Sequence, residues 1–130
     1  MKYDRFHDQL KSAGDENACA PIAVAIASGE SFEDVMAAFE LAGRKPKGTS
    51  HWGVILKAID ILGYKLAKNS IESKSVRTAE RELRRYYPNE PLILDLPSHW
   101  AAWDGEIIDD WTRGSCKRVS GEIFKLIKKA

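Results

Sequence analysis

The most reactive side chains of this chain are two cysteines and three histidines, and two of the five lie beside features that suit catalysis. Cys19 lies in a long apolar run, and His99 precedes an Asp104-Gly105 pair that is followed by further acidic residues. A thiol, an imidazole and a carboxylate together form a nucleophilic catalytic unit, in which the imidazole takes the thiol proton and the carboxylate orients the ring. The fold must then supply the carboxylate and bring the three groups together.

The segment around Asp104-Gly105 predicts a hairpin that pairs His99 with Asp110. Asp-Gly between two apolar runs is typical of a two-residue type I′ turn. With that turn His99 is directly opposite Asp110, and opposed side chains share one face of a sheet with Cβ atoms about 4.5–5.5 Å apart. Asp109 then points to the other face, and Asp104 lies roughly 15 Å along the strand from His99. Asp110 is therefore the expected partner of the imidazole.

Cys19 is expected in the first turn of a buried helix. Residues 18–27 are apolar on every side, and Pro21 is tolerated only in a first turn, so the helix begins at about Cys19 or Ala20. Gly29 ends it. The unpaired N–H groups and the dipole at this end favour a thiolate, and the same N–H groups would stabilise a substrate oxyanion. Apolar burial raises the pKa of a thiol, and we expect the favourable charges to outweigh it.

The remaining pattern predicts helices in the first half of the chain and strands in the second. Ser31 is expected to cap a second helix and Thr49 or Ser50 a third. The third helix would bury Trp52, Ile55, Ile59 and Leu62, and a further helix over residues 76–86 would turn Ala79, Leu83 and Tyr86 inward. Strands are expected at residues 64–67, 91–96, 99–103, 106–111, 116–119 and 123–127, of which the last also fits a helix. The segment around His7 is expected to be loose. The fold class is therefore α+β.

Composition excludes several classes of protein. The chain has 130 residues, 44% of them hydrophobic and 30% charged, which predicts a single globular domain spanning residues 1–130. A net charge of +1 disfavours a nucleic-acid partner. No run is apolar for long enough to span a bilayer, and no signal peptide is recognised, so we expect no membrane partner and a cytoplasmic protein with free thiols. Without a CxxC pair we expect no metal site, and nothing in the sequence calls for a cofactor.

Four segments resemble a known family. The chain is similar to small phage-encoded papain-like cysteine peptidases, which are distant relatives of the double-glycine leader peptidases. The resemblance covers about residues 15 to 120, and it rests on residues 17–25 (NACAPIAVA), 42–49 (AGRKPKGT), 99–105 (HWAAWDG) and 110–114 (DWTRG).

The resemblance implies a papain-like fold, in which a buried helix that carries Cys19 packs on an antiparallel sheet that carries His99 and Asp110. These three residues would be catalytic, and Trp111 would shield the hydrogen bond between His99 and Asp110. One departure concerns the oxyanion donor. The family usually has a Gln about six residues before the cysteine, where this chain has Ala13, and the nearest candidates are Asn17 and Gln9.

The expected activity is hydrolysis of a peptide or isopeptide bond, or acyl transfer from one. Two alternatives remain open. One is a non-catalytic phage protein that binds a host protein on this scaffold, which the missing Gln favours. The other is an amidase of cell-wall peptides. A phage origin would place the protein in the host cytoplasm or with the virion.

The other reactive and charged residues are expected to be structural. His51 is expected at the surface in the first turn of a helix, and Cys116 in a strand. Arg77, Arg81, Arg84 and Arg85 recur at helical spacing and predict a solvated face. The basic loop at residues 44–47 either lines a substrate cleft or is solvated.

Overall fold

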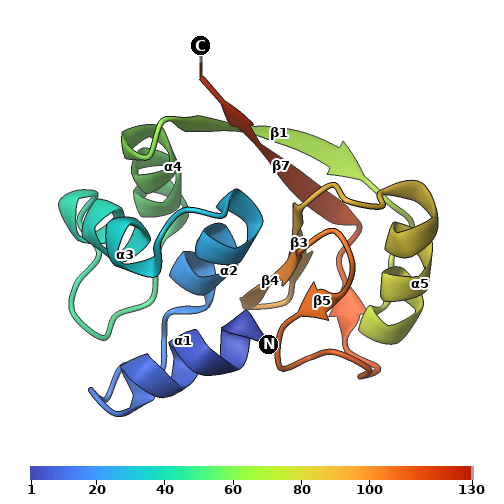
Figure 1. The fold of residues 1–130 in the computed structure, drawn as a ribbon, viewed down its shortest axis with the longest axis horizontal. Coiled ribbons are helices and arrows are strands. Elements are labelled where there is room, and N and C mark those ends of the chain that lie inside the picture. The colour runs from blue at the N-terminus through green and yellow to red at the C-terminus, as the bar shows by residue number, and fades with distance from the viewer. Residues whose placement is uncertain (130) are drawn as a thin grey trace.

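A computed structural model describes residues 1–129, and the chain folds into a mixed α+β structure. An antiparallel sheet runs through the middle, helices α1–α4 cover one of its faces, and α5 covers the other (Figure 1). The helices are α1 (Lys2–Lys11), α2 (Cys19–Ser28), α3 (Phe32–Leu41), α4 (Trp52–Ile61) and α5 (Val76–Tyr86). The strands are β1 (Tyr64–Ser70), β2 (Lys74–Ser75), β3 (Leu92–Leu96), β4 (His99–Trp103), β5 (Ile108–Asp109), β6 (Arg118–Val119) and β7 (Glu122–Lys128).

The main sheet has the strand order β1-β7-β3-β4-β5, and β2 pairs with β6 in a separate ribbon. Alternation along the strands sends apolar side chains to both faces. Ile93, Trp100, Ala102 and Phe124 meet the core under α1–α4, whereas Leu94, Ala101, Trp103 and Ile123 meet the core under α5. The central strands are buried on both faces, which fixes their register and therefore the position of His99 at the start of β4.

The Cys19 helix is formed as expected. The α2 helix begins at Cys19, and Gly29 ends it in the left-handed conformation with a φ of 73°. Every residue from Ala20 to Ile26 is buried, and the helix packs on β4. The Ser31 cap is also confirmed, since its Oγ accepts a hydrogen bond from the Asp34 N–H.

Several expectations about helices are wrong. Residues 2–11 form the α1 helix rather than a loose segment, because Tyr3, Phe6 and Leu10 recur at helical spacing and pack into the core. The N-cap of α4 is His51 rather than Thr49 or Ser50. Two large side chains expected to be buried are exposed, namely Trp52 at the start of α4 and Tyr86 in the last turn of α5.

The strands after β4 are shorter than the sequence suggested. The strand expected over residues 106–111 is reduced to β5, and the one expected over 116–119 is reduced to β6, so that Cys116 lies in the preceding loop. The last segment is a strand, β7, and not a helix. Strand β2 was not expected at all.

The hairpin has a longer loop than the predicted two-residue turn. Trp103 pairs with Ile108, and the loop runs from Asp104 to Ile107. The Asp104 carboxylate accepts the N–H groups of Glu106 and Ile107, and this Asx-type turn holds the chain open beyond Gly105. His99 and Asp110 are therefore not directly opposed. The register has moved by two residues, which keeps the paired residues Ile108 and Asp109 on their predicted faces.

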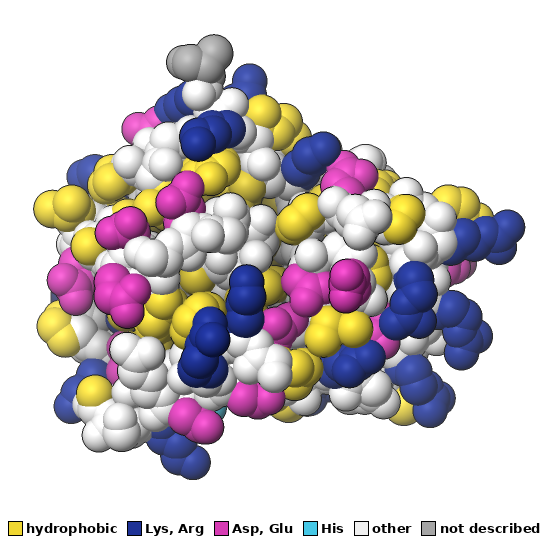
Figure 2. Space-filling model, viewed as in Figure 1, with side chains coloured by type: hydrophobic (Ala, Val, Ile, Leu, Met, Phe, Trp, Pro, Cys, Tyr) yellow, Lys and Arg dark blue, Asp and Glu magenta, His cyan; other side chains and the backbone are white. Residues whose placement is uncertain are grey.

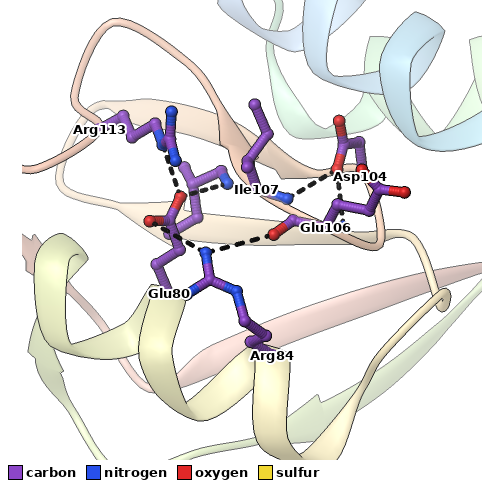
Figure 3. A network of polar contacts seen from close by, with 7 residues as sticks. Glu80, Arg84, Asp104, Glu106, Ile107 and Arg113 are labelled. Atoms are coloured by element: carbon purple, nitrogen blue, oxygen red, sulfur yellow. Dashed lines mark hydrogen bonds and ion pairs between the residues drawn. The ribbon is translucent and has the colours of Figure 1, made fainter.

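Helix α5 holds the end of this loop in place (Figure 3). Glu80 Oε1 accepts hydrogen bonds from the Ile108 N–H and from Arg113 Nε, both at 2.8 Å. Arg84 lies between Glu80 and the carbonyl of Glu106. Part of the arginine face of α5 is therefore engaged with the hairpin rather than only solvated.

Gly105 fits its site only as glycine, and we expect Gly105→Ala to destabilise the protein by about 1–3 kcal/mol. Its φ is 103°, and a Cβ would lie 3.0 Å from the Asn89 Cα, a backbone atom that cannot turn aside. Gly114→Ala is the matched control, because Gly114 also has a positive φ but has open space around it. Urea unfolding should show a larger loss for Gly105→Ala, and equal losses would contradict the close approach to Asn89.

Candidate active site

The imidazole of His99 and the carboxylate of Asp110 form the centre of the site. His99 Nε2 lies 3.0 Å from Asp110 Oδ1 and 2.9 Å from Oδ2. Asp110 follows β5 directly, and its side chain is 1% exposed. The other carboxylate, Asp109, points away and accepts the N–H groups of Lys2 and Tyr3 at the start of α1. The two adjacent carboxylates thus have separate partners, Asp109 at the start of α1 and Asp110 at the imidazole.

Thr112 holds the Asp110 carboxylate in place. Its N–H and its Oγ1 both donate to Asp110 Oδ2, at 3.1 and 2.6 Å, and Thr112 is fully buried. The sequence reasoning missed this residue. A hydroxyl residue two positions after a carboxylate is a common local hydrogen-bonding pattern, and this was the available signal.

The Cys19 thiol lies against the other side of the imidazole. Burial raises the pKa of this thiol, but hydrogen bonds from His99 and from the N–H groups of Trp100 and Ala20 outweigh burial and lower the pKa. Because Nε2 of His99 is bound to Asp110, Nδ1 is the nitrogen left for the thiol. Neither Cys19 nor Cys116 is in a disulfide.

The pKa of the His99 imidazole is raised, which is opposite to the shift of the Cys19 thiol. Burial alone would lower the pKa of His99, but its hydrogen bonds to Asp110 and Cys19, together with their negative charges, raise the pKa to about 9. A lowered thiol pKa beside a raised imidazole pKa favours a thiolate–imidazolium ion pair at neutral pH.

Two aromatic residues border this pair. The Trp111 ring lies 5.4 Å from the His99 ring and is half exposed, so it covers the imidazole on the solvent side. Tyr3 of α1 is buried beside Cys19 and Asp110, and burial and these two negative groups raise its pKa. Tyr3 escaped the sequence reasoning because the α1 helix itself was missed.

The two oxyanion candidates lie in different places. Asn17 borders a hollow of about 230 Å³ together with Cys19 and His99, but its amide nitrogen already donates to the Lys47 carbonyl at 2.8 Å. Gln9 is on α1 and borders a separate hollow with Phe6 and Glu30, so the structure does not bring it to the thiol. The Cys19 N–H has no acceptor within residues 1–129 and is free to donate.

The loop before Cys19 is tied to the basic loop after α3. Arg44 donates to both carboxylate oxygens of Asp15, at 3.0 and 2.9 Å, and the arginine side chain is 2% exposed. Burial opposes ionisation of Asp15, but the hydrogen bonds and charge of Arg44 lower its pKa. Arg44 therefore neither lines a cleft nor is solvated, and it anchors the segment that leads into α2.

Hollows open on both sides of the thiol. One, of about 360 Å³, is bordered by Cys19, His51, Asp95 and Trp100, and the other is the hollow that contains Asn17. His51 is exposed at the edge of the first hollow. The thiol is therefore reachable from solvent while most of its surroundings are buried.

No protein-family model matches this sequence, and no match is found among the curated proteins or the solved structures. Function is therefore inferred from the residues of the site. Within residues 1–129, no three His, Cys, Asp or Glu side chains gather as metal ligands would, and no helix there is long and apolar enough to cross a membrane.

Proposed function

We propose that the protein hydrolyses a peptide or isopeptide bond, or transfers its acyl group, with Cys19 as nucleophile, His99 as general base and acid, and Asp110 as the group that orients and charges the imidazole. The observation that carries this proposal is that His99, bonded to Asp110, borders the same two hollows as Cys19, and that the pKa values of Cys19 and His99 are shifted in opposite directions. A buried structural cysteine would have a raised pKa instead.

The chemistry proceeds in two steps. The Cys19 thiolate attacks the substrate carbonyl, and the C–N bond breaks as the imidazolium gives its proton to the leaving amine. His99 then takes a proton from water, the hydroxide adds to the thioester, and the C–S bond breaks to release the acid and the thiolate. The free N–H of Cys19 at the start of α2 would stabilise the oxyanion in both steps.

The arrangement of elements supports a papain-like assignment. The thiol is at the N-terminus of a buried helix that packs on β4, and β4 and the residue after β5 supply the imidazole and the carboxylate. Trp111 lies where a residue that shields the His99–Asp110 hydrogen bond would be expected.

A non-catalytic binding protein is the second candidate, and one observation favours it. Gln9 lies away from the thiol, and the Asn17 amide nitrogen uses one of its two hydrogens on the Lys47 carbonyl. The oxyanion would then depend on the Cys19 N–H and on the one remaining hydrogen of the Asn17 amide.

The deciding measurement is the pH dependence of Cys19 alkylation by iodoacetamide in a Cys116→Ser background. We expect the parent to react with a midpoint below that of an ordinary thiol, about 8.5, because the imidazolium and the N–H groups stabilise the thiolate. His99→Ala and Asp110→Asn should both raise the midpoint. Asp104→Asn is the matched control, since it removes a carboxylate of the same hairpin that lies away from His99 but keeps the Oδ1 that holds the hairpin loop.

A midpoint at or above 8.5 in the parent and in both variants would show that Cys19 is an ordinary thiol, and the enzymatic proposal would then be dropped. A low midpoint with no turnover of any peptide in a cleavage library would favour the binding protein.

A further inference from the structure

A third hollow lies on the far side of the imidazole from the thiol. It has a volume of about 380 Å³ and shares His99 and Ser98 with the two hollows beside Cys19, but Cys19 does not border it. Its remaining walls come from Leu96 and the Pro97-Ser98 turn, from Trp111 and Thr112, and from Lys117 and Arg118. The imidazole therefore separates this hollow from the nucleophile.

The charged side chains that border this hollow, other than the imidazole, are all basic. Lys117 and Arg118 border it and no acidic residue does. Neither cation forms an ion pair with an acidic side chain within residues 1–129, whereas Glu80, Glu82 and Glu90 all pair with other basic residues. The Lys117 Nζ lies 5.4 Å from the centre of the Trp111 ring. Two cations with no ion-pair partner in the described part of the chain therefore border a hollow that also contains Trp111 and the imidazole.

The direction of the reaction decides which part of a substrate would occupy this hollow. The carbonyl carbon bonds to the Cys19 sulfur, and the leaving amine takes its proton from His99. The leaving side of the substrate therefore lies toward the imidazole, and the residues after the cleaved bond continue past His99.

We propose that this hollow, formed by Ser98, His99, Trp111, Lys117 and Arg118, binds a carboxylate on the leaving side of the substrate, so that the substrates are peptides with an acidic residue shortly after the cleaved bond. Lys117 and Arg118 supply the charge, and Trp111 supplies an apolar wall. This inference rests on the proposed function, since it uses the direction of proton transfer.

The test varies only the charge of the leaving group. The probes are 4-nitrophenyl acetate and 3-carboxy-4-nitrophenyl acetate, which transfer the same acetyl group to Cys19. In each case the C–S bond forms, the C–O bond breaks and a coloured phenolate leaves. The acylation rates in a Cys116→Ser background are each divided by the rate with free cysteine, which removes the intrinsic difference between the esters.

We expect the parent to prefer the anionic leaving group, and Lys117→Gln/Arg118→Gln to lower that preference about fivefold at low ionic strength, with a smaller effect in high salt. Arg81→Gln/Arg85→Gln is the control. It removes the same charge from the exposed face of α5, where Lys and Arg side chains gather (Figure 2), and neither arginine borders the hollow. This control should leave the preference unchanged.

If both double variants lost the preference for the anionic leaving group to the same extent, net charge alone would be responsible and the proposal would be overturned. The proposal would also be overturned if neither double variant lost this preference. These outcomes are separable from failure of the proposed function. Iodoacetamide is uncharged, so the pH profile of Cys19 with His99 intact would still show an acidic thiol if only the acidic-substrate inference failed.

Discussion

Replacing Arg44 with methionine is expected to lower the free energy of unfolding by about 3–5 kcal/mol. The Asp15 carboxylate would then remain buried with the Asn17 N–H as its one remaining hydrogen-bond donor within residues 1–129. An uncompensated buried charge is costly, and Asp15 would regain a proton as the pH falls, so the loss should be greatest at neutral pH and smaller in acid. Urea unfolding at pH 7 and pH 4 measures both effects.

Lys125→Met is the matched control for this substitution. Lys125 pairs with Glu90 at 2.7 Å, but both side chains are well exposed, so its loss should cost at most about 1 kcal/mol. A second comparison is Asp15→Asn/Arg44→Met, which removes both charges and should recover part of the lost stability. If Arg44→Met cost no more than Lys125→Met, the Asp15–Arg44 pair would not anchor the loop before Cys19.

The second large effect is a pH dependence of the free energy of unfolding, which we expect in Cys19→Ala but not in the parent. In the thiolate–imidazolium form that the two pKa shifts favour, the folded protein holds its proton on His99 at about pH 7.5, whereas the unfolded chain holds it on Cys19. The two states then bind the same number of protons. The stability of the parent should therefore change little from this pair between about pH 6.5 and 8.5.

In Cys19→Ala the raised His99 pKa acts alone, because Asp110 still binds the ring. A raised folded-state pKa contributes stability that is complete below the unfolded value of about 6.5 and is lost as the pH rises through the folded value. We expect the free energy of unfolding of Cys19→Ala to fall by about 2 kcal/mol as the pH rises through the folded-state pKa of His99. A folded-state pKa of about 9 would give roughly 3 kcal/mol, but that value includes the contribution of Cys19, which this variant lacks. The measurement is the free energy of unfolding at intervals from pH 6 to 10.

Cys19→Ala/Asp110→Asn is the control for this slope. It removes the carboxylate that raises the pKa of His99, so most of the added slope should disappear. A parent with the same steep decline as Cys19→Ala would contradict a thiolate–imidazolium pair, since the thiol would then not exchange its proton with the imidazole on folding.

Sequence reasoning succeeded where a local physical signal decided the structure. Pro21 and Gly29 bound α2 at both ends, and the Ser31 cap starts α3, because these residues act through their own backbone and neighbours. The choice of Asp110 over Asp109 depended only on strand alternation. It therefore survived an error of two residues in the hairpin register, which an error of one would have reversed.

The α1 helix was missed although its apolar spacing is a local signal, but other failures depended on contacts from distant parts of the chain. The hairpin loop is held not only by the Asp104 turn but also by Asn89 against Gly105 and by Glu80 on the Ile108 N–H. Trp52 has an apolar side chain at the right spacing, yet the neighbours it finds, Trp100 and Phe124, leave it half exposed. The buried partner of Arg44 lies far away in the sequence, and nothing near Arg44 indicates it.

The adjacent carboxylates Asp109 and Asp110 limit where a residue can be inserted into the segment from Asp104 to Asp110. Asp109 holds the start of α1 and Asp110 holds the imidazole. A single residue inserted between Ile108 and Asp109 would take the place of Asp109, move Asp109 into the place of Asp110 and leave the start of α1 without its carboxylate. An insertion at the tip of the hairpin, between Asp104 and Ile107, leaves the paired residues of β4 and β5 in register but disturbs the Asp104 turn and the close approach of Gly105 to Asn89. We therefore expect an inserted residue at the tip to lower the stability of the protein while keeping the site, and an inserted residue next to the two carboxylates to disrupt the site itself.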